Sequence, residues 1–176
     1  DKKRQAVRSG LFSGKPFCLH VPCASRVIIK ANKVSEILVQ ATSNSQKFSP
    51  VFYTPEDCRY NVSCEGKWEN TAVRDICTII DYNNAPYSNL VIGEVIHRQG
   101  RWSSYIPHHH PQPEVYYYRF DKPQGFGACF IGEQAYYVKD SSFSAIPGGL
   151  AQPQVTAPGY KMYFAWMIRH IDGNPW

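Results

Sequence analysis

A histidine-rich turn that leads into an alternating strand, residues 106–120, constrains the fold of this chain most strongly. In an extended segment the side chains alternate between two faces, so His108 and His110 point the same way. The two prolines between His110 and Glu114 interrupt a continuous backbone ladder. The chain can therefore fold back at this point and bring Glu114 towards the two imidazoles.

The residues after Glu114 read as a strand with one buried face. Tyr116, Tyr118 and Phe120 follow Glu114 at every second position, so the four side chains share a face. This places a carboxylate at the end of a row of aromatic rings.

The spacing His-x-His-x3-Glu predicts a metal site made by His108, His110 and Glu114. Two imidazole nitrogens and one carboxylate oxygen suit a borderline divalent ion such as zinc, manganese, iron, cobalt or nickel. The same residues are also compatible with a solvated structural loop, or with a surface cluster that binds stray metal.

The composition favours an all-β fold. The chain has 176 residues, of which 43% are hydrophobic, and it carries 13 prolines and 12 glycines among many β-branched and aromatic residues. That length suffices for one core, or for one small domain and part of another.

The short runs between turn residues suit an antiparallel barrel. We expect a helical turn at 54–57. We expect strands at 17–22, 26–31, 36–42, 60–64, 72–81, 90–97, 128–131, 135–138 and 161–168.

Charge, hydrophobicity and cysteine spacing limit the partners and the cellular location that we expect for this chain. The formal net charge is +5, but the aromatic residues lie in strand-like runs and not on a basic helix, so we expect no nucleic-acid partner. The chain has no apolar run long enough to span a membrane, and no signal peptide is evident, so we expect no membrane partner and a cytoplasmic location. The six cysteines lack paired CxxC spacings, which favours buried thiols over disulfides.

Three segments together resemble a known family. Trp102–His108, Glu114–Phe120 and Pro123–Phe126 closely resemble the 5-deoxy-glucuronate isomerases of myo-inositol catabolism, and Ala157–Phe164 fits the same family. His-x-His-x3-Glu also looks like the first metal motif of the cupin superfamily, to which these isomerases belong. The resemblance implies a cupin barrel, which is a double-stranded β-helix or jelly roll, in a bicupin whose N-terminal barrel is incomplete.

The family pattern also implies a domain organisation. Residues 1–45 resemble the closing part of an N-terminal cupin, and the resemblance implies that the opening strands of this cupin are missing from the sequence. Residues 46–89 form a linker and inter-barrel segment, and residues 90–176 form the C-terminal cupin with the metal motif. Aromatic strands could cover a partner's edge, so a homo-oligomer is expected.

The second cupin motif departs from the family pattern. The turn Pro147–Gly149 is present, but the histidine that usually follows it is not, and Gln152 stands at or near its position. An amide oxygen binds a borderline ion more weakly than imidazole does. We therefore expect Gln152 to be the fourth metal ligand; the alternatives are a three-ligand site completed by water, or a variant without tight metal binding.

The resemblance implies conversion of 5-deoxy-glucuronate to 2-deoxy-5-keto-gluconate, an aldose–ketose isomerisation with one divalent ion, zinc before manganese, iron or nickel. The catalytic base is not assigned by the resemblance, and Glu114 and Tyr118 are the two candidates. Tyr116 and Gln124 are candidates to orient substrate hydroxyls, and Arg119 is a candidate to clamp the carboxylate of the sugar acid, as guanidinium does in bidentate pairs.

Each of these side chains has a structural alternative. Tyrosines on a barrel strand often serve as packing residues, and Arg119 could pair with Asp121. Other functions on the same fold are a different uronate isomerase, a metal-dependent oxygenase or a non-catalytic sugar-binding cupin.

Overall fold

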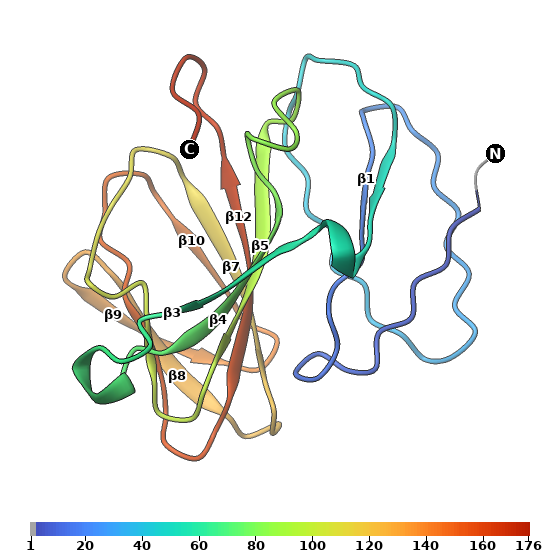
Figure 1. Ribbon diagram of the computed structural model, residues 1–176. Helices are drawn as coiled ribbons and strands as arrows, with labels where there is room; N and C mark the ends of the chain where they lie inside the picture. The colour runs from blue at the N-terminus through green and yellow to red at the C-terminus, as the bar shows by residue number, and fades with distance from the viewer. Residues whose placement is uncertain (1–2) are drawn as a thin grey trace.

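The computed structural model describes residues 3–176, and in these residues the chain forms twelve β-strands and two 3-10 turns, with no α-helix (Figure 1). The all-β prediction is therefore confirmed. No helix in the described part of the chain is long and apolar enough to cross a membrane. In chain order the elements are β1 (Cys18–His20), β2 (Val51–Tyr53), η1 (Pro55–Asp57), β3 (Arg59–Ser63), η2 (Trp68–Asn70), β4 (Arg74–Ile80), β5 (Leu90–His97), β6 (Trp102–Ser103), β7 (Glu114–Phe120), β8 (Phe126–Ile131), β9 (Gln134–Lys139), β10 (Phe143–Ile146), β11 (Gln154–Thr156) and β12 (Met162–Arg169).

Two antiparallel sheets form the barrel. One has six strands in the order β10-β7-β12-β5-β4-β3, and the other has four strands in the order β6-β11-β8-β9. A separate two-stranded sheet joins β1 and β2 in the N-terminal part, which lies beside the barrel (blue to teal in Figure 1).

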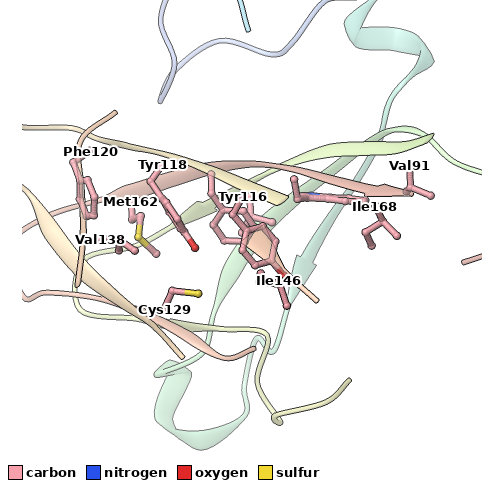
Figure 2. Packing of buried hydrophobic residues seen from close by; sticks show 12 residues of the cluster. Val91, Tyr116, Tyr118, Phe120, Cys129, Val138, Ile146, Met162 and Ile168 are labelled. Carbon is pink, nitrogen blue, oxygen red and sulfur yellow. The ribbon is translucent and has the colours of Figure 1, made fainter. Parts of the chain in front are cut away.

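The barrel core lies between the two large sheets. Tyr116, Tyr118 and Phe120 line β7 and pack with side chains of β5, β10 and β12, while Cys129 and Val138 close the cluster from β8 and β9 (Figure 2). The burial of β7 alternates along its length, as expected for a strand with one face inside a core.

One glycine in β5 permits a close contact between neighbouring strands of the six-stranded sheet. A Cβ atom on Gly93 would lie 2.3 Å from Cζ2 of Trp166 and 2.4 Å from the carbonyl oxygen of Cys77. Glycine at this position therefore leaves room for the indole of Trp166, its register partner on β12.

The N-terminal part packs on the outer face of the six-stranded sheet. Arg8 donates to both carboxylate oxygens of Glu94 in β5, at 2.7 and 3.0 Å, and Tyr163 of β12 donates to the same carboxylate at 2.7 Å. A second apolar cluster, which includes Tyr53, Cys58, Cys77 and Ile92, fills the space around this face.

Two strand predictions in the N-terminal part are wrong. Residues 26–31 and 36–42 are not in strands, and Ile28 and Val39 are about four-fifths exposed, at 79% and 80%. These runs have strand-forming side chains, but no described segment pairs with them, and a strand needs a partner for its backbone groups. The predicted helical turn is confirmed as η1, where the Asp57 carboxylate accepts from the backbone and hydroxyl of Thr54.

The segment predicted to lie between two barrels contributes to the main sheet. β3 pairs with β4, and β4 pairs with β5, with a register shift between Thr78 and Ile80. The strand predicted at 72–81 is thus confirmed, whereas the boundaries at 45 and 89 stay predictions.

Candidate functional site

The candidate site lies at the end of the barrel where β7 begins. Glu114 is the first residue of β7, and its side chain is buried on the same face as Tyr116 and Tyr118. On the neighbouring strands the partners of Glu114 are Ile146 of β10 and Ile168 of β12. Two apolar neighbours therefore flank the carboxylate within the sheet.

A glycine turn holds the histidine loop against this end of the barrel. The backbone N–H of Gly149 donates to the carbonyl of His110 at 2.7 Å. A Cβ atom on Gly148 would lie 1.8 Å from the carbonyl oxygen of Pro111, so only glycine permits this approach. The turn before β11 thus positions His110 relative to Gln152.

Four polar side chains converge at one point. His110 Nε2 lies 3.3 Å from Glu114 Oε2, and Gln152 Nε2 lies 3.2 Å from His110 Nε2. The Gln152 amide also donates to Glu114 Oε2, and to Tyr116 Oη at 3.2 Å. We call His110, Glu114, Tyr116 and Gln152 the barrel-end cluster. Glu114, Tyr116 and Gln152 are buried, and His110 is partly buried.

The donor atoms of the barrel-end cluster fit a divalent cation. Two ligand atoms bound at 2.0–2.2 Å to one ion are about 3.0–3.5 Å apart, which matches the separation of His110 Nε2 and Glu114 Oε2. A half-turn of the Gln152 amide would present Oε1 at the same point, because the two amide atoms are interchangeable by rotation. The Nδ1 atom of His110 has no partner among the described residues, so the ring can carry its proton there and present the Nε2 lone pair.

His108 does not join the barrel-end cluster. Its side chain is exposed, and its Nδ1 atom lies 2.9 Å from the carbonyl of Ile106. Within residues 3–176, no group of three or more His, Cys, Asp or Glu side chains is arranged to hold a metal ion. The cluster supplies two such side chains and one amide, and His108 would add a third only if its loop rearranged.

The structure places Arg119 and Gln124 away from the barrel-end cluster. Arg119 alternates with Glu114 along β7, so it lies on the outer face, where it pairs with Glu36 and with Asp140 at 2.9 Å. Gln124 is exposed in the turn after β7, and six residues of strand, about 20 Å, separate Glu114 from the end that leads into this turn.

The tyrosines of the barrel interior remain neutral phenols. Burial, and then the negative charge of Glu114, raise the pKa of Tyr116 well above its ordinary value. Burial likewise raises the pKa of Tyr118, whose hydroxyl oxygen has no hydrogen-bond partner in the described part of the chain. Both can donate a hydrogen bond near neutral pH, but neither is suited to accept a proton as a phenolate.

Two residues near the cluster have no signal in the metal motif. The indole of Trp176 meets the ring of His110 edge-on, with centroids 6.1 Å apart, and packs against Trp166 at 5.9 Å. Gln154, two residues after Gln152, is fully buried, and neither of its amide atoms has a partner within residues 3–176. The alternation of β11 could have indicated Gln154, whereas nothing in the local sequence indicates Trp176.

Comparison with known proteins gives consistent matches. A family model described as the KduI/IolB family matches residues 1–176. A curated protein named 5-deoxy-glucuronate isomerase from Geobacillus thermodenitrificans (strain NG80-2) is 23% identical over 185 residues, which cover 92% of this chain and 65% of that protein. A protein of the same name from Shouchella clausii (strain KSM-K16) is 31% identical over 140 residues, covering 66% of this chain and 51% of that protein.

A solved structure shares the fold. The crystal structure of an IolB-like protein from Salmonella typhimurium LT2 matches with a TM-score of 0.64 at 21% identity, covering 70% of this chain and 50% of that one. The cupin prediction is thereby confirmed. The chain spans between about half and two thirds of the length of the curated relatives it matches.

Proposed function

Because the chain belongs to the KduI/IolB family, we propose that it acts as a metal-dependent aldose–ketose isomerase that converts 5-deoxy-glucuronate to 2-deoxy-5-keto-gluconate in inositol catabolism. The names of the curated relatives support this substrate. The observation that carries the proposal is the barrel-end cluster, in which an imidazole, a carboxylate and an amide converge inside a cupin barrel.

His110, Glu114 and Gln152 would hold the ion, for which zinc is the first candidate and manganese, iron and nickel are others. A divalent ion at this position would supply Lewis-acid polarisation of the substrate carbonyl and its neighbouring hydroxyl oxygen. The small-molecule partner is thus an open-chain sugar acid with two adjacent oxygen atoms.

The reaction needs a group that carries a proton between adjacent carbons. A base removes the proton from the hydroxyl-bearing carbon C2, which gives an enediol, and returns it to C1, while the hydroxyl proton of O2 ends on O1. Glu114 is the one carboxylate of the barrel-end cluster, and it is available for this transfer only if it does not bind the ion. Tyr116, held neutral by burial, would donate to an oxygen of the enediol.

Replacing Glu114 by Gln tests the role of the carboxylate. The amide keeps an oxygen ligand but cannot accept a proton at catalytic pH. If Glu114 carries the proton, the variant retains most of its bound metal and loses at least about a hundredfold in kcat, as is typical for removal of a general base. If Glu114 is chiefly a ligand, metal content and kcat fall together. Unchanged metal content and unchanged kcat would contradict both roles.

The matched comparison is Gln124→Glu, which makes the reverse exchange of one nitrogen for one oxygen at an exposed amide outside the cluster. This variant should keep both metal and turnover.

We also propose a cytoplasmic location, which the six unpaired thiols support, since free cysteines are typical of reducing compartments.

A further inference from the structure

The strand β9 forms an open edge of the four-stranded sheet. It pairs with β8 on one side, and no described segment pairs with its other side. Among the edge strands of the two large sheets it is the longest, with six residues against five in β3, four in β10 and two in β6. A long open edge is a ready template for pairing with another chain.

The hairpin register shows which backbone groups of β9 are free. Ile131 and Gln134 flank the two-residue turn of the β8–β9 hairpin, so Gln134, Tyr136 and Val138 direct their backbone groups towards β8. The backbone N–H and C=O groups of Ala135 and Tyr137 point away from β8, towards the open side of the edge. Lys139 has the same outward orientation, but its N–H and carbonyl are already satisfied by Ser142, at 3.1 Å each.

The side chains beside this edge are aromatic and exposed. Tyr136 and Tyr137 are 48% and 69% exposed, and the Tyr137 ring stacks on Phe126 of β8 with centroids 5.6 Å apart. An open, largely apolar hollow of 490 Å³ runs along the outer face next to them, between β9 and β11. Apolar surface of this kind on a sheet edge is typical of an interaction site.

We propose that β9 pairs with β9 of a second copy of this chain, antiparallel about a two-fold axis at Tyr136. This register joins Ala135 to the partner's Tyr137, and Tyr137 to the partner's Ala135. Both positions present free backbone groups, so the seam gains four backbone hydrogen bonds without disturbing Lys139.

Side-chain charge and size agree with this register. It places Glu133 of each copy opposite Lys139 of the other, and both side chains are exposed and make no ion pair within residues 3–176. The ring of Tyr137 would lie over the small side chain of Ala135 beside the apolar hollow. A surface that complements itself in this way forms a closed, isologous dimer. The pairing is independent of the proposed activity.

The test is sedimentation equilibrium of the full chain over a wide concentration range, at low and high salt. The wild type should be a dimer, and Glu133→Lys or Lys139→Glu should each raise its dissociation constant at least tenfold at low salt. The double variant Glu133→Lys with Lys139→Glu should restore dimerisation, because both ion pairs return with reversed sign. Glu65→Lys, which makes the same charge change at another exposed position, should have no effect.

Ala135→Pro provides a second arm. Proline removes the Ala135 N–H, which faces solvent in a single copy, so the fold should survive and the dimer should be lost. Near-ultraviolet circular dichroism would show that the fold is kept. A wild type that is monomeric at all concentrations would overturn the proposal. So would a dimer that tolerates both the single charge reversals and Ala135→Pro, since its interface would then lie elsewhere.

Discussion

At the scale of single residues, Gln152 links the members of the barrel-end cluster. Its amide touches the other three members of the barrel-end cluster, so any change there alters the cluster as a whole. It also stands near the position where the cupin pattern places a histidine. The chain thus offers an amide where an imidazole would bind a borderline ion more tightly.

Replacing Gln152 by His should therefore tighten metal binding, by at least about tenfold in the dissociation constant, because imidazole is the stronger ligand for such ions. Competition with a chromophoric chelator would measure this. Gln152→Leu, which keeps the size but removes the donor, should weaken binding. Equal affinity in all three proteins would show that Gln152 does not contact the ion.

At the scale of elements, the Arg8–Glu94–Tyr163 contact joins the N-terminal part to β5 and β12. Glu94 is 8% exposed, so its carboxylate depends on these two donors. A buried charge that loses its partner costs much more than an exposed one, because it cannot regain hydration.

Arg8→Met should destabilise the protein by about 2–4 kcal/mol, since it leaves Glu94 with one donor and keeps the apolar stem. Urea unfolding would give the free energy. Arg4→Met, which removes an exposed guanidinium that bonds only to a neighbouring carbonyl, is the control and should change little. A small effect of Arg8→Met would mean that the N-terminal part is not fastened by this contact.

Particular residues show how far the sequence predicts this structure. The row Glu114, Tyr116 and Tyr118 follows from alternation alone, because one face of β7 must be buried. The same alternation puts Arg119 on the outer face with Glu36 and Asp140, where a clamp for a substrate in the barrel cannot form. The expected contact of His108 with the cluster is not present, because loop orientation is set by tertiary contacts such as that of Gly149 with His110.

The failed strands have another cause. Residues 26–31 and 36–42 carry strand-forming side chains, but pairing depends on a partner that a local pattern does not specify. The meeting of Gln152 with Glu114, 38 residues apart, was accessible only through the family resemblance.

At the scale of the whole molecule, buried imidazoles couple stability to pH. Burial lowers the pKa of His20 and His170, and it lowers the pKa of His97 to about 3, with the charge of Arg74 adding to the effect. In the unfolded chain these rings take up protons near pH 6.5, whereas in the folded protein each ring stays neutral to a lower pH because its pKa is lowered. The folded state therefore binds fewer protons below pH 6.5, so stability is complete above that pH and falls as the pH drops, for His97 down to about pH 3.

Because of His97, the free energy of unfolding should fall by about 1.4 kcal/mol for each pH unit below pH 6.5. Between neutral pH and roughly pH 5 the loss is about 2 kcal/mol. Urea unfolding of the wild type and of His97→Gln at the two pH values would measure it, and the variant should lose this part of the dependence. His109→Gln, at an exposed position, should keep the full slope. An identical slope in wild type and His97→Gln would contradict the assignment.

The metal site at the barrel-end cluster is tested most directly by the metal content of the full, untagged chain purified without chelator, measured by elemental analysis. The wild type should carry close to one divalent ion per chain. His110→Ala should lose it, and His109→Ala, one residue away but exposed, should keep it; His108→Ala reports whether the loop supplies a further ligand. A wild type without metal, or a His110→Ala variant that retains it, would contradict the metal site at the barrel-end cluster.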